Sequence, residues 1–191
     1  MGKSSKSQPV APARQRATIV IADANLEDAR ATRMAIESAG PHLWTREVGS
    51  GKKLISYLQG KGKFSDRVDF PYPNLIFLDL KIRAMEGLSL LCWLMNNPPH
   101  NLIPVVALCR SKERRLANAA YTLGARDFLV KPLKGGAFKR ILASLGNTPN
   151  GLRLREIPAG AAASTEAVPP PCRAVYAPGP TKKETCLARA S

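Results

Sequence analysis

"NLIFLDL", residues 74–80, is the strongest strand that the sequence predicts, and it carries the acidic residue Asp79 near its end. Four further runs predict strands, and helical patterns separate all five; these runs are 17–22, 43–48, 103–108 and 126–130. Alternating strands and helices are typical of a parallel sheet with helical crossovers. We therefore expect one domain of five βα units over residues 17–145.

The carboxyl ends of these predicted strands carry the candidate functional residues. Asp23 follows the first strand, and Asp79 lies in the third. Cys109 follows the fourth strand and Lys131 follows the fifth. Open parallel sheets bind their ligands at this edge. Two carboxylates and one ammonium gathered there would suit a hard cation and a phosphoryl group, although spacing in the sequence does not by itself establish that they meet.

Three stretches resemble the receiver domain of bacterial two-component response regulators: "PNLIFLDLKIRAMEGLSLL" (73–91), "IPVVALC" (103–109) and "GARDFLVKP" (124–132). The resemblance implies the flavodoxin-like fold of the chemotaxis regulator, a doubly wound five-stranded parallel sheet in the order 2-1-3-4-5 with helices on both faces. The segment "LLCWLMNNPPHNLIPVV" (90–106) resembles the small stand-alone regulators that partner phytochrome-type kinases.

The resemblance assigns a role to each strand-end residue. It implies that Asp79 is the phosphoacceptor and that Lys131 is the charge partner of the phosphoryl group. It places Cys109 at the position of the Ser/Thr switch residue and Phe128 at that of the aromatic switch residue. It also implies that Asp23 and Asp79 are ligands of Mg²⁺, with no other cofactor.

Two of the positions that depart from the pattern of that family bear directly on the metal and on the switch. Ala24 stands where the family has a second acid that contacts the metal, and Cys109 offers a weaker hydrogen-bond donor than Ser or Thr. Because Mg²⁺ depends on carboxylate ligands, we expect its binding to be weak or lost. The resulting hypothesis is a single-domain response regulator in phosphorelay signal transduction that is not an enzyme. Either it receives phosphate on Asp79, or it acts as an atypical pseudo-receiver that docks partners.

The resemblance also implies a partner, which would be a histidine kinase or another signalling protein. We expect docking near Lys112, Arg114 and Arg115, which lie on the helix predicted over 112–123. A homodimer is left open. Trp93 is predicted to serve the packing of its helix.

The ends of the chain have another character. Residues 1–16 are expected to form a disordered basic arm, and residues 146–191 a disordered Pro/Ala-rich basic tail. No apolar run approaches the length of about 20 residues that spans a bilayer, so we expect a cytoplasmic protein with no membrane partner.

The net charge of +15 raises nucleic acid as a further candidate partner. The two tails contain a single aromatic residue, Tyr176, and no helix-turn-helix pattern, so nucleic acid is not the expected partner. A basic nucleic-acid-associated protein and a phosphorylation-independent structural adaptor are the two alternatives.

Overall fold

The structure, a computed structural model, describes residues 17–38, 43–82, 87–133 and 135–146 of the 191-residue chain. The predicted basic arm, 1–16, and nearly all of the predicted tail, 146–191, lie outside these residues. None of the described helices is long and apolar enough to cross a membrane.

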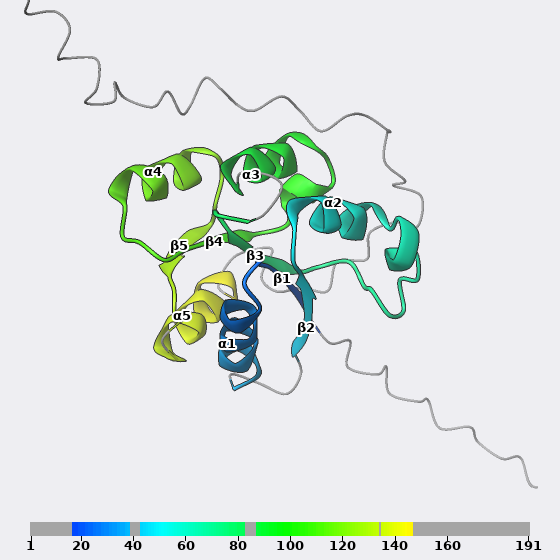
Figure 1. Cartoon of the computed structure of the whole chain (residues 1–191), viewed down its shortest axis with the longest axis horizontal. Helices are drawn as coiled ribbons and strands as arrows, with labels where there is room; N and C mark the ends of the chain where they lie inside the picture. Colours follow the sequence, from blue (N-terminus) through cyan, green and yellow to red (C-terminus); the bar gives the residue numbers. More distant parts are fainter. Residues whose placement is uncertain (1–16, 39–42, 83–86, 134, 147–191) are drawn as a thin grey trace, which may run out of the picture.

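A five-stranded parallel sheet in the order β2-β1-β3-β4-β5 forms the centre of the fold (Figure 1). The strands are β1 (Ala17–Ala22), β2 (Leu43–Val48), β3 (Leu75–Asp79), β4 (Val105–Cys109) and β5 (Asp127–Val130). The helices are α1 (Leu26–Glu37), α2 (Gly51–Gln59), α3 (Gly87–Asn96), α4 (Arg114–Thr122) and α5 (Gly135–Gly146). Strand order and helix placement confirm the flavodoxin-like fold that the resemblance implied.

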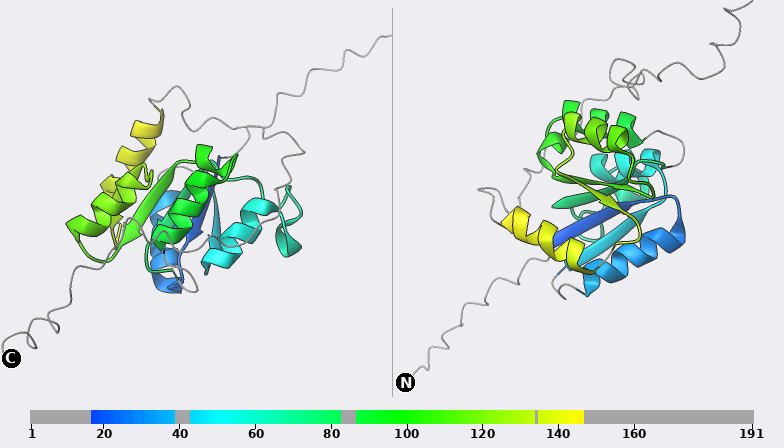
Figure 2. Two further views of the ribbon diagram at one scale, coloured as in Figure 1. Left: turned by 90° about the horizontal axis from the view of Figure 1, so that it is seen from above. Right: turned by 90° about the vertical axis from the view of Figure 1, so that its left-hand side faces the viewer.

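Helices cover both faces of the sheet, as the two side views in Figure 2 show. Helices α1 and α5 pack on one face around Ile36, Phe77 and Phe138. Helices α2, α3 and α4 cover the other face. The central strands β1, β3 and β4 are buried along their whole length, which explains why their sequences, apart from Thr18 and Asp79, are apolar rather than alternating.

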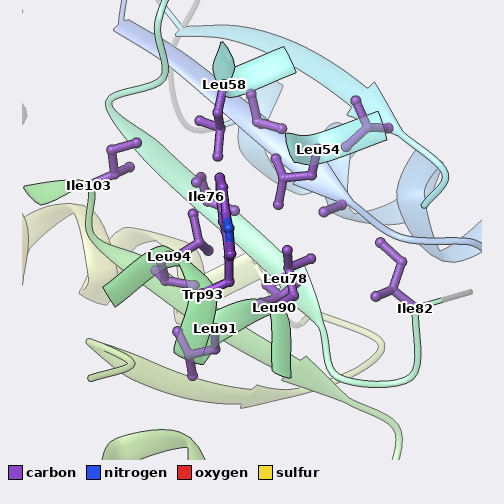
Figure 3. Packing of buried hydrophobic residues seen from close by; sticks show 14 of the residues in the cluster. Leu54, Leu58, Ile76, Leu78, Ile82, Leu90, Leu91, Trp93, Leu94 and Ile103 are labelled. Carbon is purple, nitrogen blue, oxygen red and sulfur yellow. The ribbon is translucent and has the colours of Figure 1, made fainter. Parts of the chain in front are cut away.

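Trp93 lies in the core between α3 and the sheet, as predicted (Figure 3). Its ring stacks on the buried imidazole of His100, with ring centroids 5.3 Å apart. His100 lies in a short 3₁₀ helix, His100–Leu102, and its Nδ1 is hydrogen-bonded to the Tyr72 hydroxyl. The imidazole is therefore enclosed by two aromatic rings from different segments.

The long connection between α2 and β3 is ordered by one arginine. The Arg67 guanidinium donates hydrogen bonds to the carbonyls of Tyr57 and Leu58 at the end of α2, at 2.9 and 2.8 Å. It donates a third to Phe70 O at 3.3 Å. The bond to Leu58 satisfies a carbonyl near the helix end, where intrahelical partners are lacking, whereas the Tyr57 carbonyl also accepts from the Gly60 N–H at 3.1 Å.

Two boundaries bear on the site. Cys109 was predicted to follow the fourth strand, but it is the last residue of β4 because its backbone pairs with Val130 of β5. Gly87 begins α3 at a point where a Cβ atom would lie 2.4 Å from Leu80 Cα. Only glycine allows α3 to start this close to the end of β3.

Candidate functional site

The parallel register brings three of the predicted residues together at the carboxyl edge of the sheet. Asp23 directly follows β1, Asp79 ends β3 and Lys131 directly follows β5. Ala22 is level with Leu78, so the two acidic residues that follow them leave the sheet side by side. All three side chains are buried.

The Lys131 ammonium is the centre of this site. Its Nζ lies 2.8 Å from Asp23 Oδ2 and 3.1 Å from Asp79 Oδ2. A third carboxylate, that of Asp28 in the first turn of α1, lies 2.8 Å from the same nitrogen. A lysine ammonium has three N–H donors, so three carboxylates saturate it.

Asp28 was not predicted as a site residue, and neither was its second partner, Arg110. The Arg110 guanidinium contacts Asp28 Oδ2 through both Nε and Nη2, each at 3.0 Å. One carboxylate oxygen of Asp28 therefore joins a buried ammonium to a guanidinium whose side chain is 63% exposed. Arg110 directly follows Cys109, on the connection between β4 and α4.

Asn25 connects the end of β1 to α1 and sets the position of Asp28. Its backbone N–H donates to Asp23 Oδ1 at 2.9 Å. Its side-chain oxygen caps the helix by accepting from the N–H groups of Glu27 and Asp28, at 3.0 and 3.1 Å. An N-cap followed three residues later by an acid was the one signal in the sequence that could have pointed to Asp28.

The charges of the cluster shift one another's ionisation. Burial raises the pKa of Asp23, and the hydrogen bond from Lys131 offsets this only in part. For Asp28 burial acts in the same direction, but the bonds from Lys131 and Arg110 outweigh it and lower the pKa. Burial alone would lower the pKa of Lys131, yet its bonds to Asp23 and Asp28 and the charge of Asp79 raise it. The ammonium therefore stays charged inside the fold.

The residues present do not fit a dedicated metal site. Ala24 supplies no oxygen ligand and packs half-buried against the core under α2 and α3. Both oxygens of Asp23 already accept hydrogen bonds, from Asn25 and Lys131. Asp79 likewise accepts from the Lys81 N–H at 3.0 Å and pairs with Lys131. Within the described ranges, no group of three His, Cys, Asp or Glu side chains could hold a metal ion.

The two predicted switch positions lie close to this cluster but show no direct contact with its carboxylates among the described residues. Cys109 is fully buried, and its Sγ lies 3.5 Å from the Ser111 hydroxyl. That hydroxyl donates to Glu113 Oε1 at 2.8 Å. Phe128 is half-buried on β5 and packs against the α2, α3 and α4 face.

The predicted docking residues lie apart from the buried cluster. Lys112, Arg114 and Arg115 are all exposed, with Lys112 before α4 and the two arginines in its first turn. They follow Arg110 within a few residues, so the partly exposed guanidinium of the cluster and this basic stretch belong to one continuous segment.

The sheet order, the buried aspartate at the end of β3 and the lysine after β5 define a receiver-type domain. The family model described as the response regulator receiver domain matches residues 19–143, and the chain belongs to this family. Receiver domains are generally non-enzymatic signalling modules, and they serve phosphorelay signalling with histidine kinases or phytochromes.

Three relatives illustrate the similarity. The cyclic di-GMP phosphodiesterase response regulator RpfG of Xanthomonas campestris pv. campestris is 29% identical over 116 residues, which are 61% of this chain and 28% of RpfG. Response regulator Rcp1 of Synechocystis is 33% identical over 81 residues, 42% of this chain and 53% of Rcp1. The solved bacteriophytochrome response regulator RtBRR is 28% identical with a TM-score of 0.61, covering 72% of this chain and 87% of RtBRR.

These similarities cover the receiver region. The chain spans between about a quarter and a half of the length of the curated relatives that it matches. Receiver domains generally bind Mg²⁺, and one solved structure of Rcp1 is its Mn(2+)-bound form. In this chain Ala24 offers no oxygen ligand, and the carboxylates of Asp23 and Asp79 already accept hydrogen bonds.

Proposed function

We propose that this protein is an atypical receiver that works mainly by docking partner proteins, with Asp79 as a poor phosphoacceptor. The observation that carries the proposal is the Lys131 ammonium shared by Asp23, Asp28 and Asp79. The ammonium of Lys131 lies between the three acids. Ala24 has no carboxylate that could bind a cation there.

We assign to this chain the residue roles that the receiver family implies. Asp79 is the phosphoacceptor position, and Lys131 is the charge partner of a phosphoryl group. Cys109 and Phe128 occupy the two switch positions. Mg²⁺ binds weakly or not at all, because Asp23 and Asp79 already accept hydrogen bonds from Asn25, Lys81 and Lys131.

Without a metal, the resting conformation is fixed by the ion pairs of Lys131. Charge stabilisation is the main contribution that a protein makes to phosphoryl transfer, so a site without its divalent charge transfers slowly. A fixed conformation still presents a constant surface to a partner. The receiver region, 17–145, would then signal through what it binds, in the cytoplasm and without catalysis of its own, while residues 1–16 and 146–191 flank it as basic segments.

The partner we propose is a histidine kinase or another signalling protein, with Lys112, Arg114 and Arg115 as the docking face. These three side chains are exposed at the start of α4. Exposed cations of one sign attract an acidic partner surface and speed its association. A homodimer is the second assembly to be tested, and it would need a surface other than this basic segment, because like charges facing each other across a two-fold axis repel.

The test is capture of partner proteins by the purified full chain in extracts of the native cell. Asp79→Asn removes the acceptor charge and should leave capture unchanged. Replacing Lys112, Arg114 and Arg115 together by alanine should reduce capture, whereas replacing the exposed Lys52, Lys53 and Lys61 should not, although the change in charge is the same. Capture that is lost in Asp79→Asn would overturn the docking proposal.

The same material separates the two alternatives. A basic nucleic-acid-associated protein would shift DNA with an affinity that falls steeply with salt. A structural adaptor would keep its partners when Asp79 and the docking face are both changed.

A further inference from the structure

We infer that Asp28 is an internal anion that occupies Lys131 and Arg110 and thereby keeps both cations from a phosphoryl group at Asp79. The inference deepens the proposed function, because it names the residue that restrains the acceptor and a second cation, Arg110, that would serve a phosphoryl group once Asp28 withdraws.

The contacts of Asp28 support this role directly. A single oxygen, Oδ2, accepts from Lys131 Nζ at 2.8 Å and from two nitrogens of Arg110 at 3.0 Å. A phosphoryl oxygen binds lysine and arginine through the same charge-assisted bonds. The carboxylate of Asp28 therefore makes the contacts that an anion between these two cations would make.

The position of Asp28 also makes it the acid that can leave. The Asp23 side chain is fully buried, and its other oxygen is held by the backbone of Asn25. Asp79 is the acceptor position and is held by the backbone of Lys81. The Asp28 side chain is 19% exposed and lies beside the exposed Arg110, so rotation about its side-chain bonds would carry its charge toward water.

The charges of the cluster also indicate that Asp28 opposes a phosphoryl group at Asp79. Three carboxylates face two cations, which leaves an excess of one negative charge. A phosphoryl group at Asp79 would add to that excess, and like charges at such short distances repel strongly in a buried site. Removing the Asp28 charge leaves two carboxylates against two cations and opens one donor on Lys131.

Beryllofluoride, which mimics a phosphoryl group on a carboxylate, tests the inference in the full chain. Binding is titrated by fluorine NMR in buffer containing Mg²⁺ for the wild type, Asp28→Asn and Asp28→Ala. Glu37→Gln is the matched control, since it removes one negative charge from the same helix at a surface pair with Arg33. Thermal unfolding checks that each variant is folded.

We expect Asp28→Asn and Asp28→Ala to bind beryllofluoride about tenfold more tightly than the wild type, and Glu37→Gln to match the wild type. Adding Arg110→Gln to Asp28→Asn should remove most of the gain. Binding by the Asp28 variants that is undetectable, equal to or weaker than that of the wild type would overturn the inference, because a merely structural Asp28 would lower affinity when lost. A gain that survives Arg110→Gln would overturn the assignment of Arg110.

The beryllofluoride titration and the partner-capture test can fail independently of each other. Partner capture does not depend on beryllofluoride, so a failure of capture together with a gain in the Asp28 variants would remove the docking proposal and leave the restraint by Asp28 standing. Successful capture without a gain in the Asp28 variants would remove the restraint by Asp28 and leave the docking proposal standing.

Discussion

Asp28 in α1 and Lys131 after β5 form an ion pair of 2.8 Å, as short as the pair between Lys131 and Asp23. With Asp79 at 3.1 Å, the ammonium has no N–H left for another acceptor. Three separate elements of the fold, β1, α1 and β3, are thus connected to the end of β5 by one side chain. This arrangement makes the site a stabilising part of the fold as well as a candidate site for chemistry.

Replacing Lys131 by methionine should destabilise the protein by about 3 kcal/mol, because it leaves buried carboxylates without their counter-charge. Urea unfolding at neutral pH measures the loss. Adding Asp23→Asn to Lys131→Met should recover part of it, since the most deeply buried uncompensated charge is then gone. A Lys131→Met variant as stable as the wild type would show that the ion pairs do not hold the fold together.

Ala24→Asp should strengthen Mg²⁺ binding by at least about tenfold, since it restores a carboxylate where the family has its second acid. Calorimetric titration with Mg²⁺ measures the effect. Ala31→Asp adds the same charge to an exposed position of α1 and should change nothing. Equal affinities in the wild type and Ala24→Asp would count against the alignment that places position 24 at the metal.

Gly87→Ala should lower stability by roughly 2 kcal/mol, because the new methyl group would meet the backbone of Leu80 and force α3 away from β3. Gly136→Ala is the matched control, since its Cβ would meet nothing within 4 Å, and in α5 it should stabilise by about 0.5–1 kcal/mol. Thermal unfolding of the two variants should therefore shift in opposite directions. Shifts in the same direction would contradict the close approach at Gly87.

The stability of the protein should fall as the pH drops from about 7.5 to about 5, in part because of His100. Burial lowers the pKa of this imidazole below its ordinary 6.5, and the charge of Arg67 adds to the effect. The unfolded chain then takes up a proton that the folded one resists, so the contribution of His100 is complete above pH 6.5 and is lost as the pH falls through the lowered pKa.

His100→Phe isolates this contribution. It keeps an aromatic ring between Trp93 and Tyr72 but cannot titrate. Urea midpoints measured across the same pH range should fall less steeply in the variant than in the wild type. The raised pKa of Asp23 makes stability change with pH in the opposite direction. This contribution is the same in both proteins, so it cancels in the comparison. Parallel pH profiles would show that His100 does not contribute.

Part of this site could be predicted from the sequence because a parallel sheet gathers its strand ends. Asp23, Asp79 and Lys131 each follow or end an apolar strand, so recognising the strands was sufficient to bring them together. Asp28 and Arg110 could not be found in the same way. Whether a residue in the first turn of a helix points back to the strand ends depends on how the cap orients that helix, and here Asn25 does so through its bonds to Asp23, Glu27 and Asp28.

The connection before β3 also contains contacts that could not be predicted from the sequence. Residues 60–73 show neither a strand nor a helix pattern in the sequence, but Arg67 binds carbonyls at the end of α2 and a 3₁₀ turn, Gly62–Phe64, forms within this segment. Such contacts depend on where a flexible side chain meets backbone carbonyl groups, which periodicity does not encode. The contact of Tyr72 with His100 likewise brings together two segments that show no common pattern in the sequence.

The central claim, that Lys131 and its three carboxylates make Asp79 a poor phosphoacceptor, is tested most directly by labelling. The full chain is incubated with a small phosphodonor over a range of Mg²⁺ concentrations, and acid-labile phosphate on Asp79 is quantified by mass spectrometry. Wild-type protein should label slowly and with little dependence on Mg²⁺, and Ala24→Asp should label faster and with a clear dependence. Robust, Mg²⁺-dependent labelling of the wild type would contradict the account.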